Sequence, residues 1–242
     1  MRRAVMSEVL RAVSGYSLLA VHLVALLMPL FVLFSDGSRF AVSGLDPETA
    51  SMRLLEPLAW TAISAAFVSA YGVTRESYYV SMDRTLTGIG FPRAFVGKLV
   101  AGALVAVALS LAMLVVWTLG ASILLSRNGM SLVLGPDAWR LFAGAMLGAL
   151  LGSVIGGAVG WIARNYYVTA AVILLLPMAV EFALLRTAPD VARFSPGLTL
   201  VALGVPGYQG RLLEFAPAFG LALVWAVALV AVAWMRGRRR LS

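Results

Sequence analysis

The sequence predicts an all-α, polytopic membrane protein with six transmembrane helices in a single domain, residues 1–242. Hydrophobic residues make up 61% of the chain and charged residues only 12%, which is more apolar than the core of a soluble protein of this length requires. The mean hydropathy of +0.93 agrees with this balance. The apolar residues also form six blocks close to the roughly 20 residues that a helix needs to span the hydrocarbon layer.

The predicted spans follow one another along the whole chain. They cover about residues 17–34, 57–73, 99–125, 141–163, 166–185 and 215–235. The second block is short, but Asp46 and Pro47 ahead of it suit the cap and the first turn of a helix. We therefore expect the second helix to begin outside the membrane.

The segment between the second and third spans, residues 75–98, is too polar to enter a bilayer. Its apolar residues recur at nearly heptad spacing, at Tyr79, Met82, Leu86 and Ile89. Gly88 and Gly90 weaken a helix and Pro92 stops it, so we expect an amphipathic helix of three or four turns. From the pattern alone, a helix that only lies on the membrane surface and a helix that docks a partner are equally good interpretations.

The distribution of Lys and Arg predicts the orientation in the membrane. An even number of spans places both termini on one side, and this side holds 12 of the 19 basic residues. The 12 are Arg2, Arg3, Arg11, Arg75, Arg84, Arg93, Lys98, Arg164, Arg236, Arg238, Arg239 and Arg240. We therefore expect a multi-pass protein of the cytoplasmic membrane with both termini in the cytoplasm. The net charge of +8 then reflects topology and attraction to anionic lipid, not binding of nucleic acid.

Five glycines recur at every fourth position of the fourth span, at Gly144, Gly148, Gly152, Gly156 and Gly160. One face of this helix is therefore bare backbone, which another helix can approach closely. The neighbouring helix belongs either to the same chain or to a second copy.

A short apolar segment, residues 198–205, lies between Pro196 and Pro206 after the fifth span. It is too short to cross the membrane, so we predict a re-entrant or interfacial helix on the outer side.

Two ionisable residues within the predicted spans, His22 and Glu181, are candidates for a substrate path. Their depths, at about 1.5 Å per residue, place them near opposite interfaces, which argues against a relay between them. A structural role is the alternative for each, and Glu181, which follows Pro177, is then expected to reach the outer water. No histidine pair, metal cluster or nucleophile elbow accompanies them, so we expect no catalytic residue and no metal site.

Four short motifs follow the second span in order: Arg75-Glu76, Arg84-Thr85-Leu86-Thr87-Gly88, Phe91-Pro92-Arg93 and Gly97-Lys98. Their order and position resemble the cytoplasmic signature of ABC transporter permeases of the ABC-2 type. In that family a Glu follows the second span, a Gly-Thr precedes a leucine-rich turn, and a Gly-Lys opens the third span. The six-span layout and the outer apolar segment fit as well, whereas Arg84 stands where the family often has glycine.

The resemblance implies the permease subunit of an ATP-driven exporter for a hydrophobic or amphipathic substrate, such as a drug, a lipid-like molecule or an antimicrobial peptide. Its implied partners are a separate ABC ATP-binding subunit, which holds ATP and Mg²⁺, and a second permease that is identical or paralogous. This chain would then be no enzyme and would bind no cofactor. Glu76 and Arg84 are both expected on an exposed helix. The implied contacts with the ATP-binding subunit are Arg75, Glu76, Tyr79, Met82, Asp83, Arg84, Leu86, Pro92 and Arg93.

Two other classes remain open. A proton-coupled secondary carrier would use His22 or Glu181, and it predicts inverted repeats, which the two halves of the sequence do not display. A membrane scaffold without transport activity would need no coupling segment and would recruit no ATPase.

Overall fold

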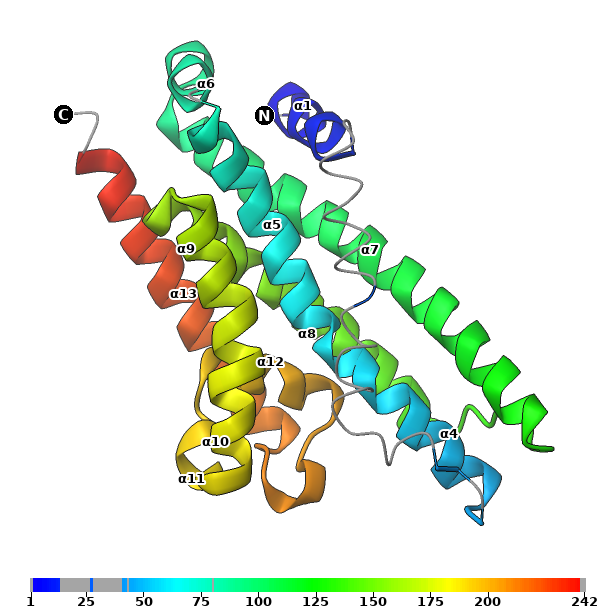
Figure 1. Ribbon diagram of the computed structural model, residues 1–242. Helices are drawn as coiled ribbons and strands as arrows, with labels where there is room; N and C mark the ends of the chain where they lie inside the picture. The colour runs from blue at the N-terminus through cyan, green and yellow to red at the C-terminus, as the bar shows by residue number, and fades with distance from the viewer. Residues whose placement is uncertain (1, 14–26, 28–40, 43, 80, 240–242) are drawn as a thin grey trace.

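The computed structural model describes residues 2–13, 27, 41–42, 44–79 and 81–239, and these residues form an all-α bundle (Figure 1). The predicted first span and His22 lie outside the described residues.

Within the described residues, five helical segments are long and apolar enough to cross a membrane. They are Pro47–Tyr78, Phe91–Arg127 (α7), Pro136–Ala163 (α8), Tyr166–Thr187 and Phe215–Arg239 (α13). The first of them consists of α4 (Pro47–Leu55), the 3-10 turn η2 (Glu56–Trp60) and α5 (Thr61–Tyr78), and the fourth of α9 (Tyr166–Ala170), η3 (Ala171–Glu181) and α10 (Phe182–Thr187). Shorter elements are α1 (Arg2–Val13), α6 (Met82–Ile89), α11 (Pro189–Ala192), α12 (Pro196–Gly204) and η4 (Tyr208–Gly210). The five segments coincide with the predicted second to sixth spans, which confirms a multi-pass helical membrane protein.

The second span begins where its sequence predicts. Asp46 is the N-cap of α4, and its Oδ1 accepts a hydrogen bond of 3.0 Å from the backbone N–H of Thr49. This bond stabilises the charged carboxylate and lowers the pKa of Asp46 below its ordinary value. Pro47 occupies the first turn, where its missing N–H leaves no hydrogen bond unmade.

The glycines of α8 lie against helices of the same chain. A Cβ atom added at Gly152 or Gly156 would collide with the backbone carbonyls of Ala62 and Ala66 in α5. One added at Gly144 would collide with the carbonyl of Leu203 in α12. The helix that approaches the glycine face is therefore α5, joined by α12, and α5 becomes the almost completely buried centre of the bundle.

The boundary between α6 and α7 differs from its prediction. Helix α6 has only eight residues and ends at Gly90, whose φ of 77° is readily adopted only by glycine. Pro92 does not stop α6, because it lies in the first turn of α7, which begins eight residues before the predicted third span. The polar segment is therefore one short helix followed by the start of a 37-residue helix.

The last part of the fifth span, α10, lies with α11 and α12 at the other end of the bundle from α6 (Figure 1). The middle of the span, η3, is a π-helix that contains Pro177, which has no N–H to donate. Helix α12 follows after a turn, and every residue from Gly197 to Gly204 is buried. This is the short apolar helix predicted between the fifth and sixth spans.

Candidate functional site

Helices α1 and α6 and the C-terminal end of α13 lie at one end of the bundle (Figure 1). A cluster of aromatic rings joins α7, α8 and α13 here, since Phe91 and Phe95 of α7 pack with Trp161 of α8 and Trp234 of α13 at centroid distances of 5.0 to 5.7 Å. Met82 of α6 is buried in the same cluster. The aromatic rings thereby fix the position of α6 at this end.

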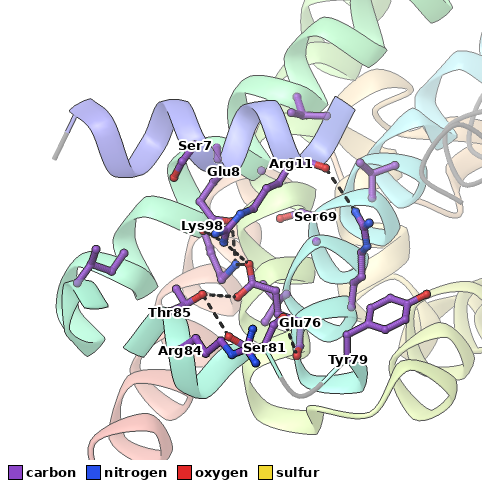
Figure 2. Close-up of a pocket in the computed structure, with 18 of the residues that line it drawn as sticks. Ser7, Glu8, Arg11, Ser69, Glu76, Tyr79, Ser81, Arg84, Thr85 and Lys98 are labelled. Atoms are coloured by element: carbon purple, nitrogen blue, oxygen red, sulfur yellow. Dashed lines mark hydrogen bonds and ion pairs between the residues drawn. The ribbon is translucent and has the colours of Figure 1, made fainter. Parts of the chain in front are cut away.

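Beside this cluster, four charged side chains from three helices meet in an ion-pair network (Figure 2). The Nζ of Lys98 in α7 lies 2.8 Å from Oε2 of Glu8 in α1 and 2.7 Å from Oε1 of Glu76 in α5. The Nη1 of Arg11 in α1 lies 2.9 Å from Oε1 of Glu76 and 3.2 Å from Oε1 of Glu8. Each cation thus pairs with both carboxylates.

The network is largely shielded from solvent. The exposed fraction of the side chain is 2% for Lys98, 9% for Glu8 and 10% for Glu76, whereas Arg11 is 56% exposed. A buried charge requires a partner, because the energy lost with its hydration has to be regained inside the protein. Lys98 therefore has its place in the apolar start of α7 only because two carboxylates surround it.

Glu76 also holds α6. The hydroxyl of Thr85 in α6 donates to Oε2 of Glu76 at 3.0 Å, and the N–H of Ser81 donates to the backbone carbonyl of Glu76 at 2.9 Å. Glu76 thereby connects α1, α5, α6 and α7. The expectation that Glu76 lies on an exposed helix is wrong, because Glu76 belongs to the last turn of α5 and is buried.

The predicted contact residues of the segment divide into two groups. Tyr79, Asp83, Arg84, Pro92 and Arg93 are exposed. Glu76 and Met82 are buried, and Arg75 and Leu86 are partly buried. The supposed apolar face is thus split, because Met82 and Leu86 pack inward whereas Tyr79, at the C-cap of α5, is 62% exposed.

A cavity of about 610 Å³ adjoins the network between α1, α5, α6 and α7 (Figure 2). Its charged lining residues are those of the network together with Arg75 and Arg84. Small and apolar residues of α5 and α7, among them Val68, Ala101 and Val105, also line it. The cavity is therefore amphipathic, and α1 forms part of its wall.

Glu181, at the end of η3, has a different environment from the one its sequence position suggests. It is 2% exposed, so the expected contact with the outer water is absent. Its carboxylate accepts hydrogen bonds from the backbone N–H groups of Leu198, at 3.0 Å, and Gly197, at 3.4 Å, in the first turn of α12. Gly197 is needed for this approach, since a Cβ atom there would collide with the carboxylate. Glu181 thus attaches α12 to the fifth span.

Sequence reasoning did not identify Glu8 as part of a site and used Lys98 only as a topology and motif residue. These two residues are 90 positions apart, so no local pattern joins them. The available signal was the lysine itself, because a cation at the start of an apolar helix requires a carboxylate nearby.

Fold and site together define an all-helical, multi-pass membrane protein with a charged cluster at one end of its bundle. Within the described residues, no group of three or more His, Asp or Glu side chains is arranged to hold a metal ion. Comparisons with protein-family models, with curated proteins and with solved structures found no significant match.

Proposed function

We propose that this chain is the permease subunit of an ATP-driven exporter of the ABC-2 type, driven by a separate ATP-binding subunit. The observation that carries the proposal is α6, a short helix that is anchored on one side and bears charges on the other. Met82 and Leu86 pack into the bundle, while Asp83 and Arg84 are exposed. A helix that transmits force from a soluble partner needs both properties, a binding surface and a rigid attachment to the spans.

The attachment of α6 reaches three neighbouring helices. Through Thr85 it is bonded to Glu76, and Glu76 is paired with Lys98 of α7 and Arg11 of α1. Displacement of α6 would therefore act directly on the ends of α5 and α7. In an exporter this displacement would follow ATP-driven closure of the partner, which supplies ATP and Mg²⁺, and a second, identical or paralogous permease would complete the transport path.

The exposed residues around α6 suit a protein partner. Tyr78 and Tyr79 are each 62% exposed, and Arg84 and Arg93 lie on the exposed surface nearby. Tyrosine and arginine are enriched where protein interfaces derive most of their binding energy. The orientation predicted from Lys and Arg places these residues in the cytoplasm, where an ATP-binding subunit is found.

The layout of the remaining helices is also consistent with this class. The buried helix α12 lies between the fifth and sixth spans, as the family resemblance leads one to expect. An amphipathic or hydrophobic cargo would then cross the cytoplasmic membrane outward. A proton-coupled carrier finds less support, because Glu181 is engaged in holding α12, although His22 lies outside the described residues.

The decisive experiment reverses two exposed charges, Arg84→Glu and Arg93→Glu, in the permease co-expressed with its ATP-binding subunit. The matched control is Arg127→Glu, an exposed arginine at the opposite end of α7. Removing a charge contact that is desolvated in an interface costs about 2 to 5 kcal/mol. We therefore expect more than tenfold weaker copurification and loss of transport-coupled ATP hydrolysis for the double variant.

Glu76 is unsuitable for this test. Its reversal would place a third cation beside Lys98 and Arg11 and would damage the fold itself. The proposal fails if the variant with both Arg84→Glu and Arg93→Glu inserts and purifies normally yet keeps its partner and full coupled activity.

A further inference from the structure

We infer that α1 is a releasable lid over the cavity at the α6 end, held by an ion-pair network that separates into two neutral pairs. The inference concerns this chain alone and does not depend on the proposed ATP-binding partner.

Two of the four contacts in the network cross between α1 and the bundle. They join Glu8 to Lys98 at 2.8 Å and Arg11 to Glu76 at 2.9 Å. The other two contacts do not cross: one lies within α1 and the other joins α5 to α7. Glu8 and Arg11 are three residues apart on α1 and pair at 3.2 Å, while Glu76 and Lys98 pair between α5 and α7 at 2.7 Å.

This arrangement lowers the free energy needed to move α1 away. A buried ion left without its partner costs about 3 to 5 kcal/mol. When α1 moves, Lys98 keeps Glu76, and Glu8 moves into water with Arg11 beside it. When the two crossing contacts separate, therefore, no charge of the network remains buried and unpaired on either side.

The described side chains of α1 are mostly exposed, with Val5 and Val9 partly buried. From Val5 to Arg11, the part of α1 whose side chains the structure describes, only Glu8 is buried. The large apolar side chains Met6 and Leu10 are 59% and 56% exposed. A further hydrogen bond, 3.4 Å long, joins Arg75 to the backbone carbonyl of Arg11. Among the described side chains of α1, the buried one thus belongs to the ion-pair network.

Release of α1 would open the cavity. Ser7, Glu8 and Arg11 of α1 line it together with residues of α5, α6 and α7 (Figure 2). Glu76 also accepts a hydrogen bond from Thr85 of α6. A movement of α6 that displaces the Glu76 carboxylate would therefore weaken its ion pair with Arg11, and with it the attachment of α1. The positions of α1 and α6 are therefore coupled through Glu76.

The test measures the position of α1 by spin-label distances in lipid nanodiscs. Labels are attached at Met6→Cys in α1 and Val100→Cys in α7, both exposed positions in a chain without native cysteine. The double substitution Glu8→Gln with Arg11→Gln removes the neutral pair of α1 and leaves Glu76 and Lys98 paired. We expect the long-distance population to rise from a minor state, below about 10%, to the major one, with the melting temperature of the bundle almost unchanged.

A matched control is the pair Asp137→Asn with Arg140→Gln, which removes an exposed ion pair with the same three-residue spacing on α8. It should leave the distance distribution as in the wild type. Lys98→Gln, which leaves two buried carboxylates without their lysine, should lower the melting temperature clearly. The inference is overturned if the Glu8 and Arg11 double variant keeps the wild-type distances, or if it melts as early as Lys98→Gln.

Discussion

Replacement of Lys98 by methionine tests whether the charge of this lysine, and not its packing, holds the network together. Methionine keeps most of the volume of the side chain but removes the cation that pairs with Glu8 and Glu76. Both carboxylates are about nine-tenths buried, and removal of one partner from a buried ion pair costs about 3 to 5 kcal/mol. Arg11 still reaches both carboxylates but is 56% exposed, so it offsets only part of this loss. We expect a net destabilisation of about 3 kcal/mol.

The measurement is thermal unfolding of the purified protein in detergent, followed by tryptophan fluorescence. For a chain of this size, about 3 kcal/mol corresponds to a decrease of roughly 6 to 12 °C in melting temperature. Arg93→Met is the control, since it removes an exposed cation from the same helix and should change stability by about 0.5 kcal/mol or less. Neutralising the carboxylates as well, with Glu8→Gln and Glu76→Gln in the Lys98→Met background, should restore most of the loss. Equal melting of Lys98→Met and Arg93→Met would refute the electrostatic explanation, and failure of the triple variant to recover would assign the effect to packing.

Three further predictions follow from separate features of the bundle. Gly152→Leu should lower the melting temperature sharply, because the new side chain would collide with the backbone of Ala62. Gly120→Leu on α7, where the added side chain would face open space, should not lower it. Similar melting temperatures of the two variants would contradict the close packing of α5 and α8. A cysteine at Arg84 should be protected from an impermeant thiol reagent in intact cells and a cysteine at Asn128 should be labelled, and the reverse pattern would invert the predicted topology. Because the folded-state pKa of Asp46 is lowered, its capping contribution is fully present above the unfolded value and is lost as the pH falls through the folded value. The first-turn amides of α4 should therefore lose hydrogen-exchange protection in the wild type only at a pH below the ordinary pKa of an aspartate. The same loss in Asp46→Asn, which does not titrate, would show that the carboxylate is not the cause.

The spans could be predicted because the bilayer restricts the possible structures so strongly. Backbone groups in hydrocarbon must pair within their own segment, so an apolar run of sufficient length becomes a helix. The same physics explains α12, since an apolar run that is too short to cross and begins with a proline must find its burial within the protein. Helix boundaries were predicted less well where one residue type has two roles. Pro92 suits the first turn of a new helix as well as the end of an old one, and only the positive φ of Gly90 decides between them.

The candidate site was only partly predictable, for a reason that Tyr79 and Glu76 illustrate. A periodic pattern assigns faces correctly only within one continuous helix, and Tyr79 belongs to the end of α5 while Met82 begins α6. Counting across that break placed Tyr79 on the same apolar face as Met82 and Glu76 on an exposed helix. Glu76 is buried because Lys98 and Arg11 approach it from other helices, and such distant partners leave no trace in the local sequence. Glu76, which was expected to be a surface contact, is instead the residue that connects α1, α6 and α7. A displacement of α6 would therefore act on buried charges, which are costly to leave unpaired.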